Sequence, residues 1–268
     1  MFILLVFSPI VTLHAQFSIV QDGWENAKQW GQSDSYTSAD AWYWAAGGIA
    51  IGAVILADEP IQNALQWSDP ETADVLSPFM EPFGDPMVMG SISALGYLGG
   101  WAFNNREIQD VSSVALQSML SAGLVAIALK ITFHRERPEE QWINDPYVFH
   151  GPSLAQNHLS FPSGHSATAF ALASSISAFY QDPLYLAIPL YSLAGLTAWQ
   201  RVYAQRHWPS DVVAGALIGT FIGRKIGKWQ RERSSKLSLK PSILFGSYSA
   251  ISLKWQLDPI SVRSEKPF

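Results

Sequence analysis

The sequence contains no cysteine and few charged residues. Without cysteine, the chain can form no disulfide, use no thiol in catalysis and bind no metal through a thiolate. Charged residues make up only 15% of the 268 positions, and the net charge is −5. A net negative charge argues against a nucleic-acid partner. The sequence also lacks a P-loop and a G-x-G-x-x-G fingerprint, so a nucleotide-binding fold is not supported.

Hydrophobic residues are abundant instead, at 48% of the chain. They gather in six apolar stretches in which Gly and Ala are frequent, while helix breakers and most charges fall between the stretches. This pattern favours helices. The sequence therefore predicts an all-α bundle of about six apolar helices, at residues 41–57, 88–104, 112–130, 166–180, 184–199 and 211–223.

We expect this bundle to be embedded in a membrane. Tryptophans near the ends of the stretches resemble the belt found at membrane interfaces; they are Trp42, Trp44, Trp101, Trp199, Trp208 and Trp229. Each stretch is shorter than the roughly 20 residues that cross a bilayer core, although flanking residues can lengthen several of them. The alternative is a soluble helical bundle with tryptophan in its core.

The two ends of the chain differ from this central part. Residues 1–15 are apolar and end in Ala15, which is typical of a signal peptide but fits an uncleaved N-terminal anchor as well. Residues 236–268 alternate apolar and polar side chains, which favours a short β-hairpin. The sequence thus predicts a signal or anchor at 1–15, a helical domain at 16–235 and a C-terminal tail at 236–268.

Three short stretches combine cations with histidines in a way that suits phosphate chemistry. They have the spacings K-x6-R-P, P-S-G-H and R-x5-H-x3-D, and span residues 130–138, 162–165 and 201–211. Lys130, Arg137 and Arg201 supply three cations, enough to outweigh a phosphate dianion. Ser163 and the Gly164 N–H supply neutral donors. Each stretch alone is a weak signal, but all three in this order are very improbable by chance.

The histidines of these stretches can carry the chemistry. A neutral His207 can attack phosphorus if an acceptor holds its second ring nitrogen, and Asp211 lies four residues further on. His165 follows Ser163 and Gly164 at a helix start, where exposed N–H groups favour an anion. His165 can then protonate the leaving oxygen and later activate water.

The three stretches resemble the signature of the type 2 phosphatidic acid phosphatase superfamily, which also contains bacterial acid phosphatases and vanadium-dependent haloperoxidases. The resemblance covers roughly residues 45–225. It implies an all-α phosphatase that needs no metal or other cofactor, with His207, His165 and Asp211 as catalytic residues. It also implies that phosphate is bound by Lys130, Arg137, Ser163, Gly164 and Arg201. Gln200 departs from the family, in which many members have serine before this arginine.

Other polar residues near the stretches match no motif position. Arg135 and Arg206 are interpreted as solvated cations or as indirect supports of the site. His134, His150 and His158 fit no metal-binding spacing, so the sequence places them at the surface rather than among ligands.

The leading hypothesis is a phosphatase that hydrolyses a phosphomonoester or pyrophosphate, of a lipid in particular, through a phosphohistidine. The alternatives are a soluble periplasmic acid phosphatase of broad specificity, a haloperoxidase holding vanadate, and a non-enzymatic membrane component with a vestigial site. Residues 58–87 are acidic and 224–236 basic. They are either two solvated surfaces or opposite membrane faces with the basic run in the cytoplasm. The second interpretation places the active site on the periplasmic, or extracytoplasmic, side of a bacterial-type cell membrane.

Overall fold

The computed structural model describes residues 23–25, 27–30, 32, 35–66, 70–138, 145–236, 239–245 and 251–257. The predicted signal or anchor at residues 1–15 lies outside this part of the chain.

The fold is all-α, as the sequence predicted. Its helices are α2 (Ser38–Ile55), α3 (Asp58–Gln66), α4 (Pro70–Met80), α5 (Pro86–Ala102), α6 (Arg106–Phe133), α7 (Gly164–Phe179), α8 (Leu184–Tyr203) and α9 (Pro209–Lys236), with a 3-10 turn η2 (Glu81–Phe83). Each of the six apolar stretches corresponds to one long helix. The acidic segment additionally forms α3, α4 and η2, which hydrophobic periodicity did not reveal.

Polar side chains fix where several helices begin. Thr37 and Asp40 form a reciprocal capping box at α2, and the Asp85 carboxylate accepts two backbone N–H groups at the start of α5. Ser163 caps α7 by accepting from the N–H of Ser166. These caps satisfy donors that the first helical turn leaves without partners.

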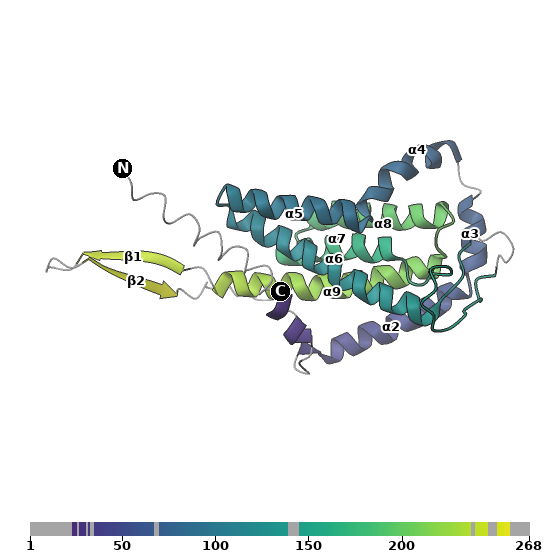
Figure 1. The fold of residues 1–268 in the computed structure, drawn as a ribbon, viewed down its shortest axis with the longest axis horizontal. Coiled ribbons are helices and arrows are strands. Elements are labelled where there is room, and N and C mark those ends of the chain that lie inside the picture. The colour runs from purple at the N-terminus through teal and green to yellow at the C-terminus, as the bar shows by residue number, and fades with distance from the viewer. Residues whose placement is uncertain are drawn as a thin grey trace, which may run out of the picture.

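Helix α7 lies at the centre of the bundle and packs against α6, α8 and α9, while α5 covers α6 and α2 lies along α9 (Figure 1). The main core joins small residues of α7 to larger ones of α9. Its fully or nearly fully buried members include Val114, Ala122, Ala167, Ala171, Ile218 and Ile226. Small residues on α7 allow neighbouring helices to come close.

The closest approach is between α7 and α9. Glycine occurs at every fourth position of α9, at Gly215, Gly219, Gly223 and Gly227, and so forms one stripe along the helix. A Cβ at Gly219 would lie 2.3 Å from the carbonyl oxygen of Ala167, well inside van der Waals contact. The two backbones therefore touch along several turns, and only glycine fits there.

The C-terminal segment contains two antiparallel strands, β1 (Leu239–Phe245) and β2 (Ile251–Leu257). Their register pairs Leu239 with Leu257 and Phe245 with Ile251. The strands coincide with the alternating segment of the sequence.

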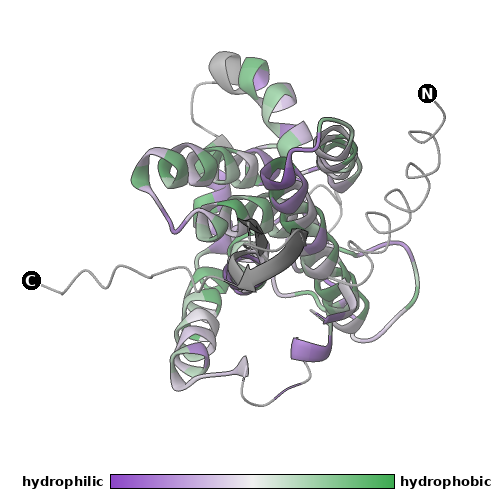
Figure 2. Cartoon of the chain, turned by 90° about the vertical axis from the view of Figure 1, so that its left-hand side faces the viewer, coloured by the Kyte–Doolittle hydropathy of each residue, from purple (hydrophilic) through white to green (hydrophobic). Residues whose placement is uncertain are grey.

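Many large apolar side chains are exposed on the outside of the bundle. Figure 2 shows that hydrophobic residues, in green, make up much of the helices. They are concentrated on α2, α5 and α6 and include Trp42, Ile49, Met87, Ile92, Leu95, Leu98, Leu120, Leu124 and Ile127. Within the described residues, α6 is the one helix long and apolar enough to span a membrane by itself. Helices α2 and α3 meet the criterion only as a pair bent by 66°. Helix length and composition alone therefore do not support the expectation that all six helices span a membrane.

The glycine stripe predicts opposite outcomes for two similar substitutions. Gly219→Ala should lower the free energy of unfolding by about 1–3 kcal/mol, because the new methyl group meets the backbone of α7. Gly123→Ala in α6 is the control, since its Cβ would meet nothing within 4 Å. This control should be neutral or stabilising by up to about 1 kcal/mol through helix propensity. Thermal unfolding of both variants would test this, and equal shifts would contradict a tight α7–α9 contact.

Candidate active site

The three sequence stretches meet at one end of the bundle, on the right in Figure 1, where α6 and α8 end and α7 and α9 begin. A backbone hydrogen bond of 2.9 Å from the Ser163 N–H to the Asp211 carbonyl joins the second stretch to the third. The charges of Lys130 and Arg137 act on His207, and those of Lys130 and Arg201 act on His165. The predicted site residues therefore share one electrostatic environment.

His207 is buried beside Asp211. Its Nδ1 lies 3.7 Å from Asp211 Oδ2, an ion-pair distance that is too long for a hydrogen bond. Burial lowers the pKa of His207 to about 3, and the nearby charges of Lys130 and Arg137 contribute to this shift. The ring is therefore neutral near pH 7, as a nucleophilic imidazole must be.

Asp211 is held by several donors. Its Oδ2 accepts from the Ser160 hydroxyl at 2.5 Å and from the Trp208 N–H at 2.9 Å. Burial alone would raise the pKa of Asp211, but contact with His207 and the charge of Arg135 keep it below the ordinary value. Asp211 thus remains a carboxylate in a fixed position.

Arg135 is fully buried, so of its two interpretations the solvated cation is wrong and the indirect support of the site fits its contacts. Its Nη1 lies 2.6 Å from Asp211 Oδ1 and its Nη2 lies 2.7 Å from Asp58 Oδ2. The Ser210 hydroxyl accepts from Arg135 Nη1 at 2.7 Å and donates to Asp58 at 2.6 Å. One guanidinium therefore joins two buried carboxylates, one of which faces His207.

Asp58 shows that the acidic segment is not wholly a surface. It begins α3, is fully buried, and accepts the Ser210 N–H at 2.7 Å at the first turn of α9. Burial raises the pKa of Asp58, although its hydrogen bonds from Ser210 and Arg135 oppose this shift. No local pattern marked Asp58, because its partners lie more than 75 residues away in sequence.

Arg201 is nearly buried and has two acceptors. Its Nη2 lies 2.8 Å from Glu81 Oε1 and its Nε lies 2.7 Å from Gln200 Oε1. The ion pair holds the pKa of Glu81 below its usual value. Glu81 is 52% exposed, so this pair can open towards solvent. Gln200, the departure from the family pattern, thus orients the arginine directly, and its amide donates to Ser77 at 2.9 Å.

His165 occupies the first turn of α7, under the turn that follows η2. A Cβ at Gly84 would lie 2.8 Å from His165 Cβ, so glycine is required for this close packing. Burial and the charge of Arg201 lower the pKa of His165 to about 4, although Asp85 and Glu81 act in the opposite direction. The pKa of His165 thus depends on nearby cations and carboxylates.

Lys130 reaches the loop that leads into α7. Its Nζ donates to the carbonyl oxygens of Leu159 and Ser160, and its Cε would lie 3.9 Å from a Cβ on Gly164. Arg137 is half-buried, and its charge acts on both Lys130 and His207. Arg206, by contrast, is exposed.

The three other histidines are not simply surface residues. His134 is buried, and it ends α6 in a left-handed conformation with φ of 48°. The burial of His134 contradicts its expected place at the surface, whereas His150 is exposed as expected and lies together with His158 and Glu136.

Comparison with known proteins supports the resemblance. Residues 113–235 match the model of the PAP2 superfamily. The chain is 32% identical to a lipid A 1-phosphatase of Porphyromonas gingivalis over 147 residues, which are 53% of this chain and 28% of that protein. It is also 32% identical to lipid phosphate phosphatase 1 of Arabidopsis thaliana over 132 residues, 40% of either chain. The match thus spans less than half the length of these relatives.

A solved structure shares the fold. A transmembrane PAP2 type phosphatidylglycerolphosphate phosphatase from Bacillus subtilis superimposes with a TM-score of 0.55 at 22% identity. The similarity covers 74% of this chain and 96% of that one. The helical arrangement is therefore that of a known PAP2 protein.

The buried network predicts a large effect of Arg135→Ala. This change leaves two buried carboxylates without their cation and should lower the free energy of unfolding by about 3–5 kcal/mol. Arg106→Ala is the control, because the Arg106–Asp110 pair is largely exposed on the arginine side and should contribute less than about 1 kcal/mol. Denaturant unfolding of both variants measures the difference, and a loss below about 1 kcal/mol for Arg135→Ala would contradict the network.

Proposed function

We propose, from the match of residues 113–235 to the PAP2 superfamily, that this protein is a phosphatase acting on a lipid phosphomonoester or pyrophosphate through a phosphohistidine. The observation that carries the proposal is the gathering of Lys130, Arg137 and Arg201 around the buried His207 and the half-buried His165. Three fixed cations can stabilise the charge of a transferring phosphoryl group, so no metal is needed for this role.

Binding comes first in the proposed mechanism. A phosphate dianion would lie between the three cations, with the Gly164 N–H and the positive end of α7 as further partners. Arg201 is engaged by Glu81 at 2.8 Å, so the substrate phosphate has to compete with this carboxylate. The outward exposure of Glu81 allows it to move away without disturbing buried groups.

His207 then attacks phosphorus. Its Nδ1 faces Asp211, which leaves Nε2 as the nucleophilic nitrogen. The new P–N bond forms as the P–O bond to the leaving group breaks, and the imidazole becomes cationic. Asp211, fixed by Arg135, stabilises this cation, and the contact of 3.7 Å shortens as charge develops.

His165 would give a proton to the leaving oxygen and then take one from the water that attacks phosphohistidine. The pKa of about 4 reflects burial and the charges of Arg201 and Lys130. A bound dianion offsets the charges of Arg201 and Lys130 and therefore raises the pKa of His165. The acid is thus formed when substrate is present.

A lipid substrate is supported by the outer surface and by the relatives. Large apolar side chains cover α2, α5 and α6, where they would contact acyl chains if the protein lies in a membrane. The similar proteins include a lipid A 1-phosphatase and a lipid phosphate phosphatase. We place the site on the extracytoplasmic side of a membrane, because the basic C-terminal part of α9 lies at the opposite end of the bundle from the site.

The two histidine roles can be separated by the leaving group. His207→Ala should abolish turnover and any acid-trapped phosphoenzyme, because the nucleophile is gone. His165→Ala should slow hydrolysis of a lipid phosphate by about 10²- to 10⁴-fold, but that of p-nitrophenyl phosphate much less, since p-nitrophenolate leaves without a proton. The measurement is kcat for both substrates with labelling of the quenched enzyme.

Asp211→Asn provides an intermediate case. Asparagine can keep His207 in place but stabilises its cationic form poorly, so kcat should fall between the wild-type and His207→Ala values. A labelled His207→Ala enzyme would show that another residue is the nucleophile. An equal His165→Ala defect on both substrates would remove His165 from the role of acid.

The phosphate clamp predicts a difference between neighbouring arginines. Arg201→Ala or Arg137→Ala should raise the barrier in kcat/KM by about 3 kcal/mol, comparable to losing one preorganised donor. Arg206→Ala is the matched control, because its exposed cation lies only five residues from Arg201 and outside the motif positions. Its kcat/KM should change by less than about threefold. Equal losses in all three variants would contradict the assigned clamp.

A further inference from the structure

A short antiparallel pairing outside the helices presents two different faces. Arg135 and Phe149 form a β-bridge, with hydrogen bonds from the Glu136 N–H to Val148 and from the His150 N–H to His134. Side chains alternate between faces along such a pair. Arg135 points into the buried carboxylate network. His134, Glu136 and His150 therefore belong to the opposite face.

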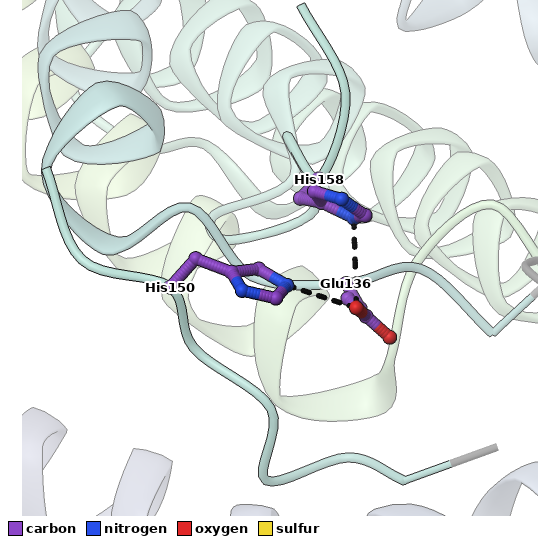
Figure 3. A group of neighbouring side chains, drawn as sticks. All are labelled: Glu136, His150 and His158. Carbon is purple, nitrogen blue, oxygen red and sulfur yellow. Dashed lines mark hydrogen bonds and ion pairs between the residues drawn. The ribbon is translucent and has the colours of Figure 1, made fainter. Parts of the chain in front are cut away.

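Figure 3 shows that this second face gathers three potential metal ligands. His150 Nε2 lies 2.8 Å from Glu136 Oε1, and His158 Nδ1 lies 3.8 Å from the same oxygen. The two imidazole rings are 4.5 Å apart between centroids. One ligand atom from each of the three residues lies within 4.8 Å of the others. Two ring nitrogens thus converge on one carboxylate oxygen.

The carboxylate of this group is more deeply buried than its two histidines. Glu136 is only 6% exposed, whereas the side chains of His158 and His150 are 24% and 42% exposed. His134 lies beside the two rings, at centroid distances of 5.8 Å from His158 and 6.4 Å from His150. Its Nδ1 is buried without a hydrogen-bond partner among the described residues. The inner side of the cluster therefore holds a nearly buried carboxylate and an unsatisfied imidazole nitrogen.

We propose that Glu136, His150 and His158 bind a divalent transition-metal ion of the Zn²⁺ type. Two imidazoles and one carboxylate are a donor set that suits Zn²⁺, with water in the fourth position. Hard cations such as Ca²⁺ or Mg²⁺ prefer oxygen ligands alone and fit this set poorly. Ligand atoms in a tetrahedral site are about 3.3 Å apart, so small side-chain rotations of His150 and His158 bring their ring nitrogens to this distance from the Glu136 oxygen.

The ion would cross-link the loop that joins α6 to α7. Glu136 immediately precedes Arg137, and its backbone carbonyl accepts from Trp208 Nε1 at 3.0 Å. His158 lies two residues before Ser160, whose hydroxyl holds Asp211. A metal at Glu136, His150 and His158 therefore fixes both ends of the loop next to the candidate active site. Its role is to hold this loop in place, and it takes no part in phosphoryl transfer.

Co²⁺ titration tests the site without relying on turnover. Full-length protein made without a histidine tag is stripped with EDTA, dialysed and titrated with Co²⁺. We expect one equivalent to give the visible absorption of four-coordinate Co²⁺, and Zn²⁺ to displace it. His150→Ala and His158→Ala should each weaken Co²⁺ binding by at least about tenfold.

Three further variants control for misfolding and for binding elsewhere. Glu136→Gln keeps the size of the side chain and should also weaken binding by at least about tenfold. Asp145→Asn, an exposed acid on the same loop, and His207→Ala should both leave the Co²⁺ spectrum unchanged. Zn²⁺ should raise the Tm of the wild type but not that of His158→Ala.

No Co²⁺ spectrum in the wild type, or the same spectrum in His150→Ala and His158→Ala, would overturn the proposal and leave a hydrogen-bonded cluster. The stripped enzyme should keep its kcat on p-nitrophenyl phosphate well below its Tm. Loss of turnover on stripping, with rescue by metal in the His150→Ala variant, would instead contradict the proposed metal-free chemistry. The two proposals can therefore fail independently.

Discussion

The contact between the backbones of α7 and α9 determines how the rest of the site is arranged. A Cβ added at Gly215 would lie 2.4 Å from the Ser163 carbonyl oxygen. The backbones of the two helices are therefore in direct contact at their first turns. The hydrogen bond from the Ser163 N–H to the Asp211 carbonyl links them at the same level. The donors at the start of α7 and the His207–Asp211 pair are thereby held at a fixed separation, which preorganised catalysis requires.

The buried charged group of Asp58, Arg135 and Asp211 adds an electrostatic contribution to the site. Arg135 can neutralise only one of the two buried carboxylates that it contacts, so with both ionised the Asp58–Arg135–Asp211 group carries one excess negative charge. Removing such charges from water is costly, and close pairing with further hydrogen bonds is needed to offset the penalty. The excess negative charge is adjacent to His207. A cationic phosphohistidine would therefore be stabilised by a field that is already in place.

The parts of this arrangement that depend on local pattern were accessible from the sequence. Six apolar stretches gave six long helices, and the motif spacings brought Lys130, His165 and His207 to the same end of the bundle. The sequence could not place Arg135 in the core, because its partners Asp58 and Asp211 are 77 and 76 residues away, respectively. Glu81 lacked a motif for the same reason. Glu136, His150 and His158 are brought together by a β-bridge and by the fold of the loop between α6 and α7. Their spacing in the sequence therefore matches no metal-binding motif.

Glu81 suggests how binding and protonation are linked in the proposed mechanism. Arg201 pairs with Glu81 and also lowers the pKa of His165. When a phosphate takes over Arg201, the carboxylate of Glu81 is released from its ion pair while it remains near His165. Both changes favour the protonated imidazole, since one cation is neutralised and one anion is freed. The proton donor is then generated by the same exchange that positions the phosphate.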